Sequence, residues 1–366
     1  MSDVPHLRFP EFSGEWEMAS LQDIAAINPK SDQLQNTFIY IDLEAVEKGE
    51  LRKIQEIMRE EAPSRAQRVI NNNDILFQCV RPYQKNNYIH RILNTSNQQW
   101  VASTGYAQIR TTESPNYIYH LLNTDGFNRK VMVRCTGSSY PAINSEDLAT
   151  IRFYYTPDKK EQFKISRLLD LIDERIATQN KIIEKLQSLI KGLAAQLTQS
   201  GTPNIRLCDC LECHSSTLQE NCVSVTGSYP VYGATGLIGY TNNYAYSGES
   251  ILIVKDGSGV GSLSYVNDHF SIIGTLNYLT AKEKHSILYL YYALMAFNFT
   301  PYITGMAIPH IYFKDYGKAK LFYPSNEKRI RITSLLHNIE QKLVVEQNLV
   351  ISLSAQKSYL LRMLFI

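Results

Sequence analysis

The fold is decided by a stretch that occurs twice, first as Thr136-Gly-Ser-Ser-Tyr-Pro-Ala-Ile-Asn-Ser-Glu-Asp147 and again as Thr304-Gly-Met-Ala-Ile-Pro-His-Ile-Tyr-Phe-Lys-Asp315. The Thr-Gly pair, the Pro, the Ile and the Asp recur at a constant separation of 168 positions, counted from 136 to 304. After the loss of one residue the match continues from Pro157 to Pro324. A period this long indicates a duplicated domain-plus-helix unit, since solenoid repeats have roughly 20 to 50 residues. Two similar units on one frame predict a protein that binds a two-part target.

A long helix is predicted after each copy of the repeat. Apolar residues recur there in alternating steps of four and three, which is the period of a coiled-coil seam. Pro157-Asp158 and Pro324-Ser325 precede the two helices, and Gly201 ends the first. The first seam is predicted to contain Ile165, Leu169, Ile172, Ile176, Gln179, Ile183 and Leu186, and the second Leu336, Ile339, Leu343, Glu346, Val350 and Leu353.

The order of the segments predicts that the two helices run antiparallel. The first helix carries the chain into the second globular part, so the second helix must run back to bury its seam. Gln179 and Glu346 lie about halfway along their helices and would then come close together. Two interpretations stay open: a buried polar pair that fixes the register at some cost in stability, or two side chains that reach solvent from a widened seam.

The predicted boundaries give four segments: a globular domain at 1–155, a helix at 156–200, a second globular domain at 201–324 and a second helix at 325–366. The two globular parts open alike, but their middles differ in length and sequence. Such a pattern suggests one scaffold that carries two different specificities. Short β-rich runs and short helices predict mixed α/β units with a twisted, largely antiparallel sheet, so the fold class is α+β.

Composition excludes several classes of protein. A chain of 366 residues has room for two domains, and a net charge of +2 names no partner. The longest apolar run, 287–297, is far shorter than the roughly 20 residues of a membrane span. The first residues do not have the pattern of a secretory signal, and the chain has six cysteines. We therefore expect a cytoplasmic protein with free thiols.

Charge within the globular parts is more informative than the total. The segment 75–112 contains four cationic residues and no Asp or Glu, so it offers phosphate-binding donors without repulsion of a polyanion. A polar loop followed by a buried strand would explain it equally simply. The segment 221–248 carries no charged residue and holds five tyrosines among Gly, Ser, Thr and Asn. Such residues can contact base edges, but they also occur in ordinary turn-rich β structure.

Several sequence patterns that could indicate a catalytic or metal site do not match the known motifs. Cys208, Cys210, Cys213 and His214 have a spacing unlike the usual paired zinc ligands, so we expect no metal and place Cys210 in the core. The glycine-rich stretch 255–261 lacks the Gly-Lys-Ser/Thr of a phosphate-binding loop. Methyltransferase and helicase motifs are absent from the sequence, which predicts a chain with no catalytic residues of its own.

Three stretches resemble the specificity (S) subunits of type I restriction-modification systems. They are the opening Leu7-Arg-Phe-Pro-Glu-Phe-Ser-Gly-Glu-Trp16, the join Pro157-Asp-Lys-Lys-Glu-Gln-Phe-Lys-Ile165, and Tyr229-Pro-Val-Tyr-Gly-Ala-Thr-Gly-Leu-Ile-Gly-Tyr240. The order of domains and helices is also that of the family. The second copy departs in detail, with Glu327-Lys328 where the first has Glu161-Gln162.

The resemblance implies two target recognition domains, each reading one half of a bipartite DNA sequence, with the helices as a ruler between them. It also implies assembly with two methyltransferase (M) subunits and two restriction (R) subunits, which would bring S-adenosylmethionine, ATP and Mg. Two alternatives remain: a coiled-coil scaffold that binds protein only, and a self-contained DNA methyltransferase or nuclease with unrecognised motifs.

The loops after Val80 and Val254 take equivalent places in the two copies and supply the predicted DNA contacts. The nominated residues are Arg81, Lys85, Asn86, Asn87 and Tyr88 in the first copy, with Tyr229, Tyr232, Thr235, Asn242, Asn243, Lys255, Ser258 and Ser262 in the second.

Overall fold

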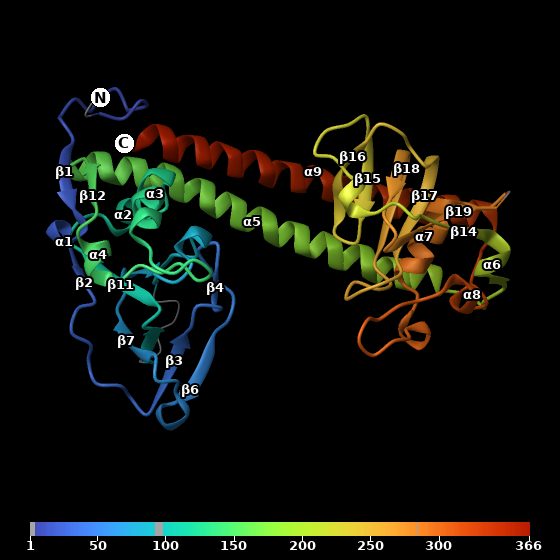
Figure 1. Ribbon diagram of the computed structural model, residues 1–366, viewed down its shortest axis with the longest axis horizontal. Helices are drawn as coiled ribbons and strands as arrows, with labels where there is room; N and C mark the ends of the chain where they lie inside the picture. The colour runs from blue at the N-terminus through green and yellow to red at the C-terminus, as the bar shows by residue number, and fades with distance from the viewer. Residues whose placement is uncertain (1–3, 92–97, 283) are drawn as a thin grey trace. The chain divides into compact units, whose positions relative to one another are not determined.

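A computed structural model describes residues 4–91, 98–282 and 284–366. The chain divides into two compact units: unit 1 holds Met1–Gln179 with Leu349–Ile366, and unit 2 holds Asn180–Asn348. Each unit combines strands with short helices and with parts of the two long helices (Figure 1). The mixed α/β class predicted from the sequence is thus confirmed. No helix in the described part of the chain is both long and apolar enough to cross a membrane.

The described part of unit 1 contains two four-stranded sheets, a two-stranded sheet and a small hairpin. Among these described strands, all pairings are antiparallel except that of β3 with β10. The first four-stranded sheet has the order β6 (Gln55–Met58), β3 (Thr37–Ile41), β10 (Trp100–Ser103), β7 (Ala66–Ile70). The second has the order β2 (Ala25–Ile27), β11 (Tyr106–Thr111), β8 (Ile75–Gln78), β9 (Tyr88–Ile89). In addition, β1 (Glu17–Ser20) pairs with β12 (Arg152–Tyr155), and β4 (Val46–Glu47) pairs with β5 (Glu50–Leu51). The short helices are α1 (Leu21–Ile24), α2 (Pro115–Leu122), α3 (Asp125–Arg134) and α4 (Ser145–Ala149).

In the described residues of unit 2, six strands form one sheet. The pairings within this sheet are antiparallel except that of β15 with β18. The order is β14 (Leu211–Ser215), β19 (Leu276–Ala281), β17 (Tyr246–Val254), β18 (Leu263–Ile272), β15 (Tyr229–Gly233), β16 (Gly236–Thr241), and β13 (Ile205–Arg206) pairs with β20 (Lys320–Leu321). The short helices are α6 (Leu207–Cys210), α7 (Ile287–Met295) and α8 (Phe313–Tyr316).

The strand before each nominated loop is buried on both faces. In β8, Ile75 and Phe77 pack into the core that holds the helices, and Leu76 packs into a second core. In β17, Ile251 and Ile253 face the helices and Leu252 faces the opposite core. Alternate side chains of a strand point to opposite faces, so a strand between two cores reads as a continuous apolar run. Both strands therefore hold the start of the following loop firmly.

The two long helices pack antiparallel within each unit. In unit 1 the beginning of α5 (Lys159–Thr198) shares a core with the end of α9 (Asn326–Leu364), and Lys357 pairs with Asp173 at 2.5 Å. In unit 2 the end of α5 shares a core with the beginning of α9 through Ala194 and Leu336. The antiparallel pairing predicted from the segment order is confirmed.

The seam residues are buried near the helix ends and half-buried elsewhere. Ile165, Leu169, Ile172 and Leu336 are buried, because the globular part of each unit also covers the ends. The predicted residues Ile176, Ile183, Leu186, Ile339, Leu343, Val350 and Leu353 are half-buried. Gln179 and Glu346 are only 3% and 6% exposed, so neither extends into solvent as one interpretation required. Glu346 also pairs with Lys342, one turn earlier on α9.

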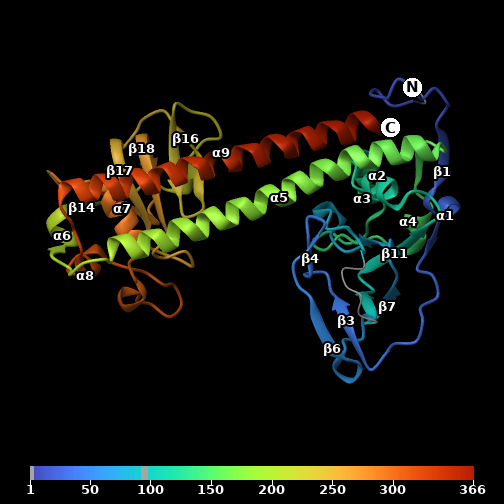
Figure 2. The same cartoon turned by 180° about the vertical axis from the view of Figure 1, so that it is seen from behind.

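A short helix in each unit lies against a long helix in a matching way. Ser114 caps α2 and Ser286 caps α7, and each hydroxyl accepts a hydrogen bond from the backbone of a tyrosine three residues later. The hydroxyl of Tyr117 accepts from Thr156 N at 3.3 Å, and that of Tyr289 donates to Phe322 O at 2.7 Å. Both ribbon views place α2 beside the first turns of α5 (Figures 1 and 2).

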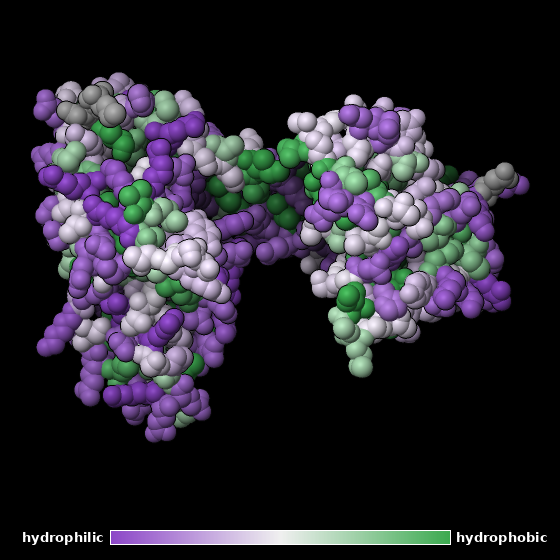
Figure 3. Space-filling model, in the orientation of Figure 1, coloured by the Kyte–Doolittle hydropathy of each residue, from purple (hydrophilic) through white to green (hydrophobic). Residues whose placement is uncertain are grey.

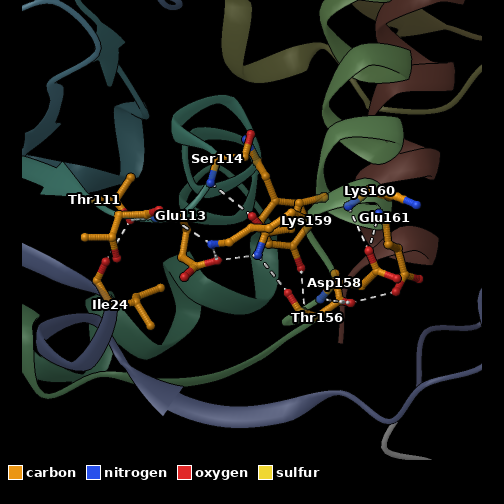
Figure 4. Close-up of polar contacts among 12 residues, drawn as sticks. Ile24, Thr111, Glu113, Ser114, Thr156, Asp158, Lys159, Lys160 and Glu161 are labelled. Atoms are coloured by element: carbon orange, nitrogen blue, oxygen red, sulfur yellow. Dashed lines mark hydrogen bonds and ion pairs between the residues drawn. The ribbon is translucent and has the colours of Figure 1, made fainter.

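The start of α5 is fixed to unit 1 by a buried polar cluster (Figure 4). Glu161 is fully buried; Arg8 donates to both of its carboxylate oxygens at 2.7 and 2.8 Å, and Thr156 donates at 2.6 Å. Gln162 accepts from Ser114 N at 3.0 Å and donates to Thr156 O at 2.8 Å. The residues that resemble the family motif therefore join the helix to the globular part, and they satisfy each other's charges and donors.

Candidate nucleic-acid interface

The loop after β8 is wrapped around one buried side chain. Gln78 is 3% exposed; its amide donates to Val80 O at 2.8 Å and to Gln84 Oε1 at 2.9 Å, and its carbonyl accepts from Asn86 N at 3.2 Å. Arg81 and Lys85 flank a single 3-10 turn, with φ angles of 54° and 52°. Left-handed backbone at non-glycine residues is strained and is found preferentially at functional sites. The backbone of the loop is therefore rigid, and it holds the exposed side chains of the loop in fixed positions.

Three of the five nominated residues of unit 1 have accessible side chains. Arg81 is half-buried, and its guanidinium carbon lies 4.4 Å from the centre of the Tyr140 ring. Lys85 donates to Asp125 at 2.6 Å, and this hydrogen bond lowers the pKa of the Asp125 carboxyl. Asn86 accepts from Lys48 N at 3.0 Å. Arg81 is the most available of the three for a phosphate or a base.

Two nominated residues of unit 1 are buried and present almost no surface for a DNA contact. Asn87 is 2% exposed; its carbonyl accepts from Gln78 N at 2.9 Å and its amide donates to Asn123 at 3.1 Å. Tyr88 is 6% exposed and points into the core from β9. The sequence interpretation extended the loop too far, because residue 88 already belongs to a strand that pairs with β8.

Of the four cations in the acid-free segment 75–112, three have side-chain hydrogen-bond partners among the described residues. Arg110 forms a two-pronged pair with Asp74, both distances being 2.8 Å, and this carboxylate lies just before the segment. Arg91 bonds Asn73 and Asn116. Among the described residues, Arg81 makes no ion pair. The inference from the absence of acidic residues within the segment therefore overestimated its free positive charge, because the partners come from outside the segment.

Each candidate interface includes a second hairpin, which the sequence interpretation did not nominate. We call residues 136–142 and 304–310 the TG hairpins. Thr136 pairs with Ala142 and Thr304 pairs with His310, and Gly137 and Gly305 have φ angles of 87° and 88°. The signal for them was the duplicated motif itself, which keeps the Thr-Gly and Pro residues while the tip changes.

Each TG hairpin is attached to the strand-end loop beside it. Arg81 N donates to Pro141 O at 2.7 Å, and Gly257 N donates to Pro309 O at 2.9 Å. These bonds make Gly257, not Lys255, the structural counterpart of Arg81. The sequence pairing of Val80 with Val254 was wrong by two residues: β8 ends at Gln78 and β17 ends at Val254, so Val254 corresponds to Gln78. A shift of two preserves the face of a strand and so left no trace in the apolar pattern.

A cavity of about 520 Å³ in unit 1 is lined by the loop after β8, by Tyr140 of the TG hairpin and by the segment 43–52, which includes Glu44 and Glu47. Arg81, Gln84, Asn86 and Tyr140 contribute to its wall, together with Arg52. Arg52 is paired with Glu50 at 2.8 Å. The cavity offers an aromatic ring, a guanidinium and amides, which are the groups that bind bases by stacking and hydrogen bonding.

The nominated residues of unit 2 form two groups. Hydrogen bonds from Ile273 N to Tyr232 O and from Lys255 N to Thr275 O, both 3.0 Å, bring Tyr232 and Lys255 to the same turn. Burial raises the pKa of Tyr232, whose ring packs against Phe270. Ser258, Ser262 and Thr235 are exposed in turns.

The other group surrounds His269. Tyr229 lies 4.9 Å from Tyr244 and 5.9 Å from His269, measured between ring centres. Asn242 and Asn243 are exposed in the turn between β16 and β17. This group presents aromatic edges and amides, so any DNA contact here would read the shape or the bases of the DNA.

The cysteine group shows structural roles. Cys210 is buried and its thiol donates to Leu207 O at 3.3 Å, as the core placement predicted. Burial raises the pKa of Cys210 to about 12 and that of Cys213 to about 11, so both thiols stay protonated at neutral pH. Zinc binds the thiolate form. Within the described residues, no group of three or more His, Cys, Asp or Glu side chains is arranged to hold a metal.

The model of the type I restriction-modification DNA specificity domain matches residues 13–188 and 205–353 of this chain. The chain belongs to that family. The resemblance seen in the sequence is confirmed, and the specificity domain is present in two copies, one for each half of the duplicated sequence.

Known relatives agree on fold and family. A putative type I specificity subunit of Mycoplasma pneumoniae is 30% identical over 138 residues, and the EcoprrI specificity subunit of Escherichia coli is 26% identical over 112 residues. These matches cover 36% and 31% of this chain and only 43% and 28% of the relatives. The crystal structure of the S subunit from M. genitalium has the same fold, with a TM-score of 0.65 at 16% identity, and the match covers 99% of both chains.

Proposed function

We propose that this chain is the DNA-recognition subunit of a cytoplasmic type I restriction-modification complex, in which each unit reads one half of a bipartite, asymmetric target. The observation that carries the proposal is the duplicated interface: a rigid strand-end loop and an attached TG hairpin occur in both units. Their backbones agree, whereas their exposed side chains differ. Two similar frames with different contact groups are what an asymmetric two-part sequence requires.

The long helices act as the ruler between the half-sites in this proposal. α5 and α9 contain 40 and 39 residues, which corresponds to about 60 Å each at 1.5 Å per residue. Half-sites one helical turn apart are separated by about 34 to 36 Å. Continuous helices of this length can hold two DNA-reading parts at a fixed spacing.

Methyltransferase and restriction subunits would dock on the helices and on the segment before β1, and would supply S-adenosylmethionine, ATP and Mg. Unit 1 has an apolar groove of about 600 Å³ lined by Phe9, Phe12, Phe163, Leu168 and Leu171. Phe163 is 66% exposed, which is unusual for an aromatic residue without a partner. Of the four cations on its rim, Lys159, Lys164 and Arg167 already pair with Glu113, Glu11 and Glu174. We therefore assign the groove to a predominantly apolar segment of a methyltransferase subunit.

The second copy has a related apolar patch on α9. Counting from the helix starts, Ile330 takes the place of Phe163 and Leu335 that of Leu168; they are 56% and 46% exposed. Two equivalent patches fit two methyltransferase subunits. Phe163→Ser should weaken assembly with that subunit, measured by co-purification and by titration of the separate proteins. Val133→Ser is the matched control, because Val133 is 87% exposed on α3 away from the groove.

No catalysis by the chain itself is part of this proposal. Binding of S-adenosylmethionine by the isolated chain would favour the alternative of a self-contained methyltransferase. A protein-only scaffold would show no salt-dependent binding of duplex DNA after assembly with its partner subunits.

The deciding experiment is to express the chain with the adjacent methyltransferase gene product and to map modified bases by long-read sequencing. A split motif with a fixed gap is the expected result. Methylation without a split motif, from an assembled complex, would contradict two-part reading.

A further inference from the structure

The tips of the two TG hairpins share a backbone but expose opposite chemistry. In unit 1 the tip is Ser138-Ser-Tyr140, and Tyr140 is 64% exposed beneath the Arg81 guanidinium. In unit 2 the tip is Met306-Ala-Ile308, in which Met306 is fully exposed and Ile308 is 66% exposed. In Figure 3 the protruding loop that lies between α7 and α8 in Figure 1 is coloured hydrophobic at its end.

This apolar tip belongs to the same surface as the proposed DNA contacts of unit 2. Ile311 N donates to Lys255 O at 2.9 Å, and Gly257 N donates to Pro309 O at 2.9 Å, so the hairpin is joined to the nominated loop on both sides. Tyr312 lies just beyond the hairpin, and Lys314 Nζ lies over its ring at 5.0 Å from the ring centre. An apolar tip flanked by Lys255 and Lys314 is suited to a partner that is anionic and has a local apolar group.

DNA has one apolar group of that kind in the major groove. The thymine methyl is the only hydrocarbon group that base pairs present there, and the remaining edges are hydrogen-bond donors and acceptors. Met306 and Ile308 side chains cannot form strong hydrogen bonds with those edges. Ser138, Ser139 and Tyr140 of the first tip carry hydroxyls and can. The tips therefore differ in the feature of DNA that each can distinguish.

We infer that the TG hairpin tips are specificity determinants, and that Met306 and Ile308 read a thymine through its methyl group. This inference rests on the proposed function, since it assigns part of the second half-site to named residues. It predicts at least one thymine in the half-site that unit 2 reads. The first tip would discriminate by hydrogen bonding instead.

The test uses the complex with the methyltransferase subunit and a duplex that carries the mapped target. Each thymine of both half-sites is replaced in turn by deoxyuridine, which lacks only the methyl group. For the unaltered complex we expect roughly fourfold weaker binding at one thymine, in one half-site, as for the loss of one buried methyl group. Met306→Ser/Ile308→Ser should abolish this difference, and Tyr140→Ser should preserve it.

The outcomes separate the inference from the function on which it rests. Equal affinities for thymine and deoxyuridine at every position, with sequence-specific binding intact, would overturn the inference alone. A methyl effect that survives in Met306→Ser/Ile308→Ser would also overturn it. Loss of specific binding by the unaltered, assembled complex would instead overturn the proposed function.

Discussion

At the start of α5 a buried carboxylate joins the helix to its globular part, whereas the equivalent position at the start of α9 holds a lysine in solvent. Counting from the helix starts, Lys328 takes the place of Glu161 and Arg329 that of Gln162, one residue later than the sequence pairing with Glu327-Lys328 suggested. Lys328 donates to Ser200 at 3.1 Å, and Arg329 donates to Pro324 O at 2.8 Å. The duplicated architecture keeps the position of the joint but not its chemistry.

The same difference in chemistry occurs about two to three turns further along the helices. In unit 1 the ring of His120 on α2 bonds Asp170 on α5 at 2.8 Å. In unit 2 the hydroxyl of Tyr292 on α7 donates to Glu340 on α9 at 2.7 Å. Both contacts join a short helix to a long one through a carboxylate. A constraint on where two elements must touch can be met by different side chains, so polar motifs are poor guides to equivalence between the copies.

The largest expected effect at the two helix starts is a loss of stability in the variant Glu161→Ala. It leaves the Arg8 guanidinium without its buried carboxylate, so we expect unit 1 to lose about 3 kcal/mol of stability. Lys328→Ala should change the stability of unit 2 by less than about 0.5 kcal/mol, because that side chain is exposed. Urea unfolding followed by tryptophan fluorescence reports unit 1 alone, since Trp16 and Trp100 both lie there; far-UV circular dichroism follows both units. Equal changes in the two variants would contradict the difference.

The two TG hairpins should respond alike to loss of their glycines. A Cβ at position 305 would lie 2.3 Å from Ile308 O, and one at 137 would lie 2.9 Å from Tyr140 O, both at positive φ. We expect Gly305→Ala and Gly137→Ala each to cost about 1 to 3 kcal/mol of local strain and to weaken DNA binding. Gly192→Ala is the control: nothing lies within 4 Å and the residue is helical, so a small gain in stability is expected. Affinity unchanged in both hairpin variants would exclude the hairpins from the interface.

The strand-end loops should differ in their contribution to DNA binding. Arg81→Ala removes a guanidinium stacked on Tyr140 and without an ion pair among the described residues, so we expect roughly tenfold weaker binding and a smaller salt dependence. Lys255→Ala should have a smaller effect, because its structural counterpart in unit 1 is the buried Cys79 and not Arg81. Both variants should still assemble with the methyltransferase subunit. Equal losses would mean that the two-residue shift in the pairing has no functional consequence.

The two helix contacts should weaken at opposite ends of the pH scale, with the smallest effect of the four. Burial alone would raise the pKa of Asp170, but hydrogen bonds from His120 and Asn116 outweigh it and leave that pKa lowered. A lowered carboxyl pKa contributes stability above the unfolded value of about 3.9 that is lost as the pH falls further. Burial, and then the bond to Glu340, raises the pKa of Tyr292. A raised phenol pKa contributes stability below the unfolded value of about 10 that is lost as the pH rises.

Amide hydrogen exchange can separate these two contacts. Protection of α2 should fall in acid, and Asp170→Asn should remove that pH dependence. Protection of α7 should fall in alkali, and Tyr292→Phe should remove the share of this pH dependence that comes from the Tyr292 hydroxyl. If α2 and α7 lose protection at the same pH, the two contacts are not the source of the difference.

The sequence by itself determined the duplication, the two long helices and their antiparallel pairing, two short helices (predicted at 116–122 and 287–297, observed at 115–122 and 287–295), and the family. These features follow from patterns that can be read within the sequence itself: heptads, the alternation of apolar residues and a constant offset between the two copies. Tertiary structure alone decided that Asn87 and Tyr88 are buried, that Arg81 corresponds to Gly257, and that Asp74 neutralises Arg110. It also decided that the changing residues of the duplicated motif lie at exposed tips. The physical reason is that pairing partners and exposure depend on residues distant in the chain, and a two-residue shift leaves the local pattern unchanged.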